Sequence, residues 1–152
     1  MNHKVAMMSS SVSTLIALAA VMLAGCGGAV DRPPLVYLVT NEGLVDGFQS
    51  SYCWDRVVGG KLCVDPNEPY FESPTLLPAT DPVQIQFDTP LPDEVVLSIS
   101  KQIFGETIDS ESLPPSELIA WSPAVPPGDY VLDVHVTWKQ GEVSYWFSIL
   151  LE

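Results

Sequence analysis

The chain repeatedly alternates apolar and polar residues with a period of two, and this pattern predicts β-strands. In residues 83–88, Val83, Ile85 and Phe87 alternate with polar side chains, and residues 94–100 repeat the alternation. Successive side chains of a strand point to opposite faces of a sheet. Each stretch therefore predicts one apolar and one polar face.

The strongest alternation lies near the C-terminal end. Residues 129–139 read DYVLDVHVTWK and residues 142–152 read EVSYWFSILLE, joined through a KQGE turn. They predict a hairpin of two strands, each up to ~30 Å long. Residues 34–40 predict a first strand, while residues 117–121 fit either a strand or a helical turn.

After residue 25 the chain favours an all-β domain. No window of ten or more residues there shows a helical period. About seven short antiparallel strands, separated by polar and proline-rich turns, predict a sandwich of two sheets. Thirteen of the fourteen prolines fall outside the predicted strands, and Pro34 is the first residue of one, where a missing N–H does least harm.

The N-terminus has the layout of a secretory signal peptide. A short polar start carrying Lys4 precedes an apolar run over residues 12–23, and the small residues Ala24 and Gly25 then precede Cys26. The apolar run is too short to cross ~30 Å of hydrocarbon comfortably, which argues against a membrane span.

The sequence Leu23-Ala24-Gly25-Cys26 resembles the lipobox of bacterial lipoproteins at all four positions. The resemblance implies diacylglycerol on the Cys26 thiol, cleavage before Cys26 and acylation of the new amino group. Several acyl chains on one residue form a durable membrane anchor. The alternative is an ordinary secretory signal with a chance cysteine.

The resemblance divides the chain into a signal peptide of residues 1–25, a lipidated Cys26 with a tether of residues 26–34, and one domain over residues 35–152. Residues 27–34 of this tether span at most ~28 Å when fully stretched. The residue after Cys26 is Gly27, which is not acidic and favours the outer membrane in a two-membrane bacterium. In a single-membrane bacterium the anchor would lie on the outer face of the cell membrane. In either case the expected location is extracytoplasmic.

The remaining cysteines, Cys53 and Cys63, are expected to form a disulfide, because thiols oxidise outside the cytosol. Nine residues separate them, so they are not a redox Cys-x-x-C pair. The turn signal Gly59-Gly60 between them predicts a hairpin of residues 49–54 and 61–64. Metal binding by the two thiolates is the alternative, but no further ligands lie nearby in the sequence.

Pairing Cys53 with Cys63 places Asp55 opposite Lys61 in the hairpin. It also places four apolar side chains on the face away from the sulfurs: Tyr52, Trp54, Leu62 and Val64. The disulfide would then clamp the outer face, and closing so short a loop would stabilise the fold by roughly 3 kcal/mol.

Two stretches, SYCW…CVD near the start of the domain and YVLDVHVTW…GEVSYWFSI at its end, resemble small bacterial lipoproteins with an immunoglobulin-like domain. Tyr130, at the start of a long strand after a glycine turn, resembles the tyrosine corner of such sandwiches. A plain core tyrosine is the alternative. The resemblance implies an immunoglobulin-like fold and an extracytoplasmic location, but it implies no activity.

The charge of the chain excludes several partners. The formal charge of −13 becomes −14 once Lys4 leaves with the signal peptide. This argues against nucleic acid, which needs a basic footprint, and against lying flat on anionic lipid. The acidic residues are spread along the chain, as on a surface that keeps an exported protein soluble. Attraction of cations or of a basic partner is the alternative.

No catalytic, cofactor or metal signature is present, and we expect a protein that is not an enzyme. His135 is the only imidazole left after the signal peptide, and its place beside Asp133 and Thr137 predicts a solvent-facing side chain. There is no Gly-x-Ser-x-Gly elbow, phosphate loop or dinucleotide fingerprint.

Acidic pairs leave two weaker possibilities. Asp93–Glu94 and Asp109–Glu111 are expected in proline-flanked loops, where carboxylates could in principle serve a hydrolase. Asp65–Glu68 could contact calcium, but it lacks the spacing of a twelve-residue calcium loop.

Two places are candidates for binding a partner. Trp146 lies on the polar face of the last strand, where it would be an exposed aromatic anchor unless both faces are covered. Leu76 and Leu77 lie in residues 72–82, a connector or a recognition loop. We expect a membrane-anchored, non-enzymatic interaction module with an unknown protein or glycan partner. A peptidase inhibitor presenting residues 72–82 or 109–117 is the alternative.

Overall fold

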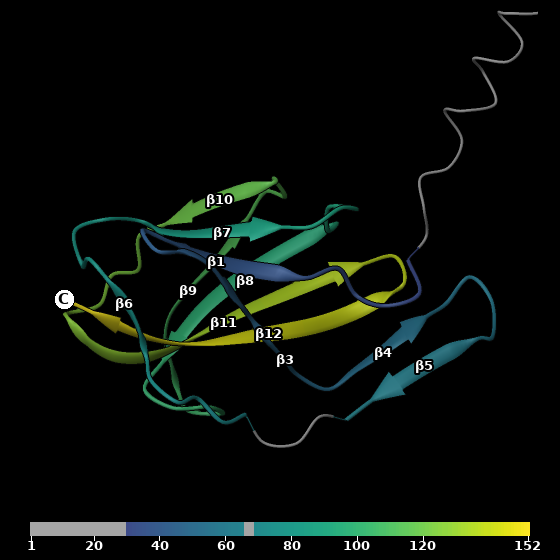
Figure 1. Cartoon of the computed structure of the whole chain (residues 1–152), viewed down its shortest axis with the longest axis horizontal. Helices are drawn as coiled ribbons and strands as arrows, with labels where there is room; N and C mark the ends of the chain where they lie inside the picture. The colour runs from purple at the N-terminus through teal and green to yellow at the C-terminus, as the bar shows by residue number, and fades with distance from the viewer. Residues whose placement is uncertain (1–29, 66–68) are drawn as a thin grey trace, which may run out of the picture.

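The computed structural model describes residues 30–65 and 69–152, and these residues form twelve β-strands and no helix (Figure 1). The strands are β1 Val36–Thr40, β2 Gly43–Asp46, β3 Phe48–Gln49, β4 Tyr52–Asp55, β5 Lys61–Val64, β6 Thr75–Leu77, β7 Val83–Phe87, β8 Glu94–Ser100, β9 Thr107–Leu113, β10 Leu118–Trp121, β11 Gly128–Trp138 and β12 Gly141–Leu151. The predicted signal peptide and Cys26 lie outside the described residues, as do residues 66–68 of the calcium candidate. In the described part, no helix is long and apolar enough to span a bilayer.

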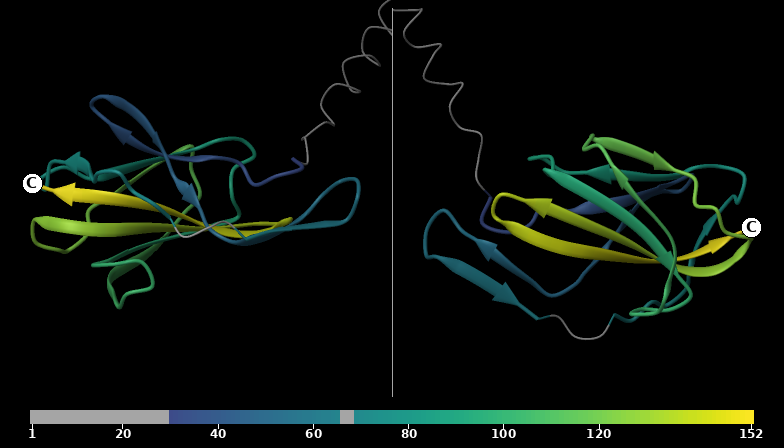
Figure 2. Two further views of the ribbon diagram at one scale, coloured as in Figure 1. Left: turned by 60° about the horizontal axis from the view of Figure 1, so that its bottom comes forward. Right: turned by 180° about the vertical axis from the view of Figure 1, so that it is seen from behind.

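Two sheets face each other, which confirms the predicted all-β, immunoglobulin-like sandwich. One sheet has the strand order β10-β7-β1-β2 and the other has the order β3-β12-β11-β8-β9, with β6 beside β12. The two layers are visible in Figure 1, with β10, β7 and β1 above β8, β11 and β12, and again from behind in Figure 2. The hairpin β4–β5 forms a separate two-stranded sheet.

The apolar faces of the predicted strands meet in one core between the sheets. The long strands β11 and β12 alternate strictly, and every second side chain is buried. Their buried residues are Tyr130, Leu132, Val134, Val136, Trp138, Val143, Tyr145, Phe147, Ile149 and Leu151. Strand β7 contributes Val83, Ile85 and Phe87 from the opposite sheet. Burial of each large apolar side chain stabilises the fold by about 1.5–3 kcal/mol. The apolar residues at alternate positions therefore stabilise the sandwich.

Tyr130 has the tyrosine-corner contact that the sequence suggested. Its side chain is 2% exposed, and its hydroxyl donates a hydrogen bond of 2.7 Å to the carbonyl oxygen of Pro126, four residues earlier. The ammonium group of Lys101 lies 3.7 Å from the centre of its ring. A buried tyrosine bonded back to the chain just upstream is typical of immunoglobulin-like sandwiches.

Four strands were not predicted: β2, β3, β6 and β9. β3 and β6 pair with successive parts of one edge of β12, and β9 pairs with the free edge of β8. Each is short or largely polar, so its own alternation is weak. An edge strand offers unpaired N–H and C=O groups, and this tertiary context recruits the neighbouring chain. Residues 117–121, which were ambiguous, contain the strand β10.

Two predicted loops are corrected by these strands. Most of residues 109–117 is not a loop, because β9 extends to Leu113 and includes Asp109 and Glu111. Asp109 serves the fold, because its carboxylate accepts hydrogen bonds from the backbone N–H groups of Ser110 and Ala124. Residues 72–82 contain β6, which runs parallel to β12. Residues 78–82 and 114–117 of the two segments lie outside the strands.

The short hairpin has the predicted register. Cys53 pairs with Cys63, Trp54 with Leu62 and Asp55 with Lys61, and the two cysteines form a disulfide. The first strand begins at Tyr52 rather than at residue 49, because residue 49 belongs to β3. The turn contains Gly59 and Gly60 at φ of +94° and +72°, a left-handed conformation that favours glycine.

The face of this hairpin opposite the disulfide packs on the turn between β11 and β12. Trp54 is fully buried and meets Trp138 edge to face, with ring centres 5.5 Å apart. The N–H of Asp55 donates to the carbonyl of Gln140 over 2.8 Å. A Cβ at Gly141 would collide with the carbonyl oxygen of Cys53, so glycine permits the two hairpins to approach this closely.

Residues 30–34, which precede β1, contact the domain. The indole N–H of Trp54 donates to the carbonyl oxygen of Val30 over 2.8 Å, and the hydroxyl of Tyr145 donates to the carbonyl oxygen of Pro34. Pro33 and Pro34 are buried. Two buried aromatic side chains therefore hold the start of the described chain.

Candidate functional site

Four aromatic side chains gather on the outer face of the larger sheet, and we call them the aromatic surface: Phe48, Phe71, Phe104 and Trp146. They come from β3, the segment before β6, the connection between β8 and β9, and β12. Trp146 was predicted as a binding candidate. The other three were missed, because they lie far from Trp146 in the sequence and come together with it only in the folded chain.

The rings form a continuous chain of contacts. Phe48 lies parallel to Trp146, with ring centres 6.3 Å apart and an interplanar angle of 6°. Phe104 meets Trp146 edge to face at 5.2 Å, and Phe71 meets Phe48 edge to face at 6.3 Å. Offset-stacked and edge-to-face arrangements are the favourable geometries of aromatic pairs.

Register and turn conformation create this arrangement. Phe48 is the direct cross-strand partner of Trp146 in the pairing of β3 with β12. Phe104 adopts φ of +57°, which is uncommon for a residue with a bulky side chain, and its side chain is 89% exposed. An exposed phenylalanine with an unfavourable backbone conformation contributes little to folding. Such backbone conformations gather at functional sites.

A partly buried carboxylate lies beside the aromatic surface. Asp133 is the cross-strand partner of Trp146 on β11, and its Oδ1 atom is buried without a hydrogen-bond partner in the described chain. Burial raises the pKa of this carboxyl, while the nearby side chains of Ser144 and Trp146 and the charge of His135 oppose the shift. The surface therefore combines flat apolar rings with one acceptor that lacks a partner.

His135 lies in the neighbouring row of the same face and is partly exposed, as predicted. Its Nδ1 atom is 3.1 Å from the hydroxyl of Ser144, and its Nε2 atom is 3.8 Å from a carboxylate oxygen of Glu142. These are the residue types of a hydrolytic triad, but they project side by side from paired strands. The N–H of Ser144 already donates to Ser50, so it cannot stabilise an oxyanion. His135, Ser144 and Glu142 therefore form a polar ladder across the paired strands β11 and β12.

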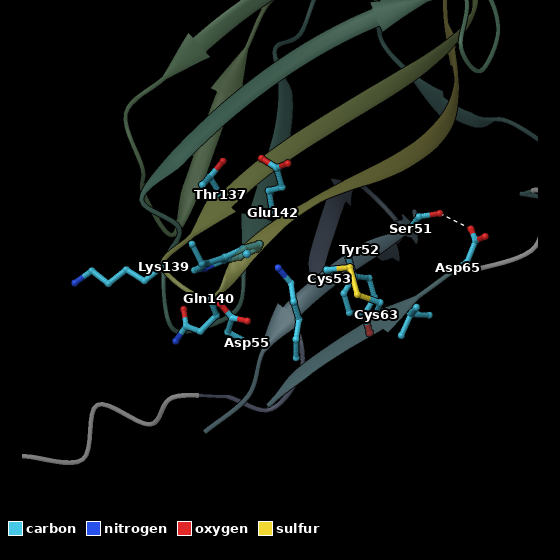
Figure 3. A pocket seen from close by; sticks show the side chains of 14 residues that line it. Ser51, Tyr52, Cys53, Asp55, Cys63, Asp65, Thr137, Lys139, Gln140 and Glu142 are labelled. Atoms are coloured by element: carbon cyan, nitrogen blue, oxygen red, sulfur yellow. Dashed lines mark hydrogen bonds between the residues drawn. A yellow bond between two sulfur atoms is a disulfide. The ribbon is translucent and has the colours of Figure 1, made fainter. Parts of the chain in front are cut away.

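The hairpin β4–β5 and the turn between β11 and β12 enclose an open hollow of about 760 Å³ (Figure 3). It is lined by residues 51–53, Asp55, Lys61, 63–65 and 137–142. Figure 3 shows the disulfide on its wall and the hydrogen bond of 2.6 Å from Ser51 to Asp65. Charges of both signs line it, and its two cysteines are joined to each other, so neither is a free thiol.

A second open hollow, the flank groove, has a volume of about 1040 Å³. It is lined by residues 39–45, 73–78 and 81–84 and by Glu152. The predicted candidates Leu76 and Leu77 both lie here, but they face differently. Leu76 is 60% exposed, while Leu77 is buried in the core. Trp146 is not among the lining residues, so the structure assigns the predicted candidates to two separate surfaces.

Within residues 30–65 and 69–152, no group of three or more histidine, cysteine, aspartate or glutamate side chains could hold a metal ion. No protein-family model, curated protein or solved structure matches the chain. A functional proposal therefore rests on the chemistry of the surfaces described above.

Proposed function

We propose that this chain is an exported lipoprotein, anchored through an acylated Cys26, that binds a protein or glycan partner without acting as an enzyme. The observation that carries the proposal is the aromatic surface. Phe104 is 89% exposed, and the half-buried Trp146 lies between it and Phe48 on the outer face of the larger sheet. Clustered surface aromatics mark interaction sites, and tryptophan is enriched among the residues that dominate binding energy.

The chemistry of this face suits recognition of a partner more than folding. None of the four rings belongs to the buried core cluster, so their removal leaves the core residues in place. Asp133 adds an unsatisfied acceptor next to the apolar rings. Binding sites commonly combine aromatic area with a few polar groups that fix orientation.

An anchor at Cys26 would keep the domain close to the bilayer. Only residues 27–29 separate Cys26 from Val30, whose carbonyl is held by Trp54, and the four residue steps from Cys26 to Val30 span at most about 14 Å. The acidic domain would be repelled by anionic headgroups, which favours a partner outside the lipid surface.

Site-specific photocrosslinking in living cells tests the proposal. A benzophenone amino acid at position 104 reacts with C–H bonds of proteins and sugars alike, and the same group at Val58 is the control, because Val58 is 79% exposed on the distant hairpin turn. We expect a defined product from position 104 that is absent from position 58 and is lost when Trp146→Ala is added. Identical products from both positions, or a product that persists in the Trp146→Ala variant, would contradict the proposal.

A further inference from the structure

The flank groove is lined in part by two edge strands, β2 and β6, and also by the ends of β1 and β7. β2 is the outer strand of the smaller sheet, and β6 lies on the outer side of β12 in the larger one. In the part of the chain that the structure describes, neither outer edge is paired with another strand. An unpaired edge presents a row of N–H and C=O groups that can template a further strand.

The edge of β2 has these groups available. Thr40 and Gly43 close a hairpin loop of only two residues, Asn41 and Glu42. Alternate residues of an antiparallel strand bond to one neighbour, so Leu44 and Asp46 direct their N–H and C=O groups away from β1. β6 is the poorer template, because Pro74 and Pro78 on either side of it have no N–H to donate.

The lining of the groove selects the chemistry of an occupant. Glu42, Asp81 and Glu152 contribute carboxylates, and none of the described lining residues is a lysine, arginine or histidine. Leu44 and Leu76, which are 49% and 60% exposed, contribute apolar area. An extended segment that alternates apolar and basic side chains would match both properties.

We infer that the flank groove binds an extended basic segment of another protein by adding it as a strand beside β2. In such strand addition, backbone hydrogen bonds supply affinity and the alternating side chains supply specificity. The volume of about 1040 Å³ slightly exceeds the range for ligand pockets, roughly 300–1,000 Å³. A second copy of this chain is a poor occupant, because each mature copy carries a charge of −14.

This site is separate from the aromatic surface, since none of its lining residues belongs to that cluster. The absence of binding in the groove would therefore leave the proposed aromatic site standing, and the absence of a partner at the aromatic surface would leave the groove standing. Trp146→Ala should leave binding in the groove unchanged.

The inference is tested with a blocked octapeptide in which lysine alternates with valine. Its binding to the mature full-length lipoprotein in detergent is measured by calorimetry. Hydrogen exchange should show slower exchange at the β2 amides when the peptide is present, because the outward N–H groups of Leu44 and Asp46 become bonded. The Glu42→Gln, Asp81→Asn double variant should bind the peptide about tenfold more weakly, because two ion pairs are lost.

Two matched controls separate strand addition from general charge attraction. The Glu106→Gln, Glu117→Gln variant changes the net charge equally, at two exposed positions outside the groove, and should bind as the unchanged protein does. A peptide N-methylated at alternate residues keeps its charge but cannot form the ladder, and we expect no measurable binding. Equal weakening by both double variants, or undiminished binding of the methylated peptide, would overturn the inference.

Discussion

The two hairpins of this protein reach stability by different routes. The hairpin β11–β12 has eleven residues in each strand, lies inside the larger sheet and buries every second side chain in the core. The hairpin β4–β5 has four residues in each strand and forms a separate two-stranded sheet. It is joined by the disulfide Cys53–Cys63 and seated by Trp54 against Trp138.

The difference shows what a short hairpin needs. An isolated two-stranded hairpin is at best marginally stable in water. The long hairpin gains enough from burial on one face, while the short one combines a covalent link on its exposed face with one large aromatic side chain on its buried face. A disulfide persists in an oxidising compartment, so the disulfide of the short hairpin supports the proposed export.

The largest expected effect comes from removing the aromatic side chain that seats the short hairpin. Trp54→Ala should lower the free energy of unfolding by about 3–5 kcal/mol, the range for a large buried aromatic, because the cavity would open next to Trp138. Urea unfolding measures the change. Val58→Ala, at a 79% exposed position in the same hairpin, is the control and should stay within about 0.5 kcal/mol.

Replacing Cys53 and Cys63 together by serine should lower the free energy of unfolding by roughly 3 kcal/mol, through greater entropy of the unfolded chain. Hydrogen exchange locates the effect, because the amides of β4 and β5 should lose protection while those of β11 and β12 keep theirs. Equal loss of protection in both hairpins would show that they do not differ in the way proposed here.

Gly141→Ala tests the contact between the hairpins directly. The added Cβ would meet the carbonyl oxygen of Cys53, so one hairpin must shift, at a cost of about 1–3 kcal/mol. Thermal unfolding measures the change, with Lys139→Ala in the same turn as an exposed control. A Gly141→Ala protein as stable as its control would contradict the close approach.

The smallest effect concerns the outer face of the long hairpin. Burial raises the pKa of Asp133 above 3.8, so the folded protein holds this proton more tightly than the unfolded chain does. The stability from this proton is complete below pH 3.8 and is lost as the pH rises through the raised pKa. The stability of the wild type relative to Asp133→Asn should therefore fall with rising pH across that window. Acid urea titrations measure it, and a difference that grows with pH would contradict the assigned shift.

Strong alternation and a symmetric cysteine pair were sufficient to predict much of the fold. The register of the short hairpin follows from Cys53 facing Cys63, and Asp55 and Lys61 agree with it. β3, with two residues, and the three-residue β6 carry too little pattern of their own. Their existence depends on the free edge of β12, which only the assembled sheet supplies.

The aromatic surface was predictable only in part. Trp146 could be found because it stands at a polar position of a regular strand. Phe48 and Phe71 gave no signal, because their partners are distant in the sequence. Phe104 did carry a signal in the sequence. A large aromatic residue beside Gly105 in a polar connection is not expected to pack into the core.

The central claim is that the braced hairpin belongs to an exported, lipid-anchored protein, and mass spectrometry of protein from cell membranes tests it most directly. Cells are lysed with an alkylating reagent, and the mature N-terminus and all cysteine peptides are then mapped. We predict an acylated Cys26 at the N-terminus and a peptide linked through Cys53 and Cys63 that carries no alkyl group. An intact leader with all three cysteines alkylated would contradict the claim.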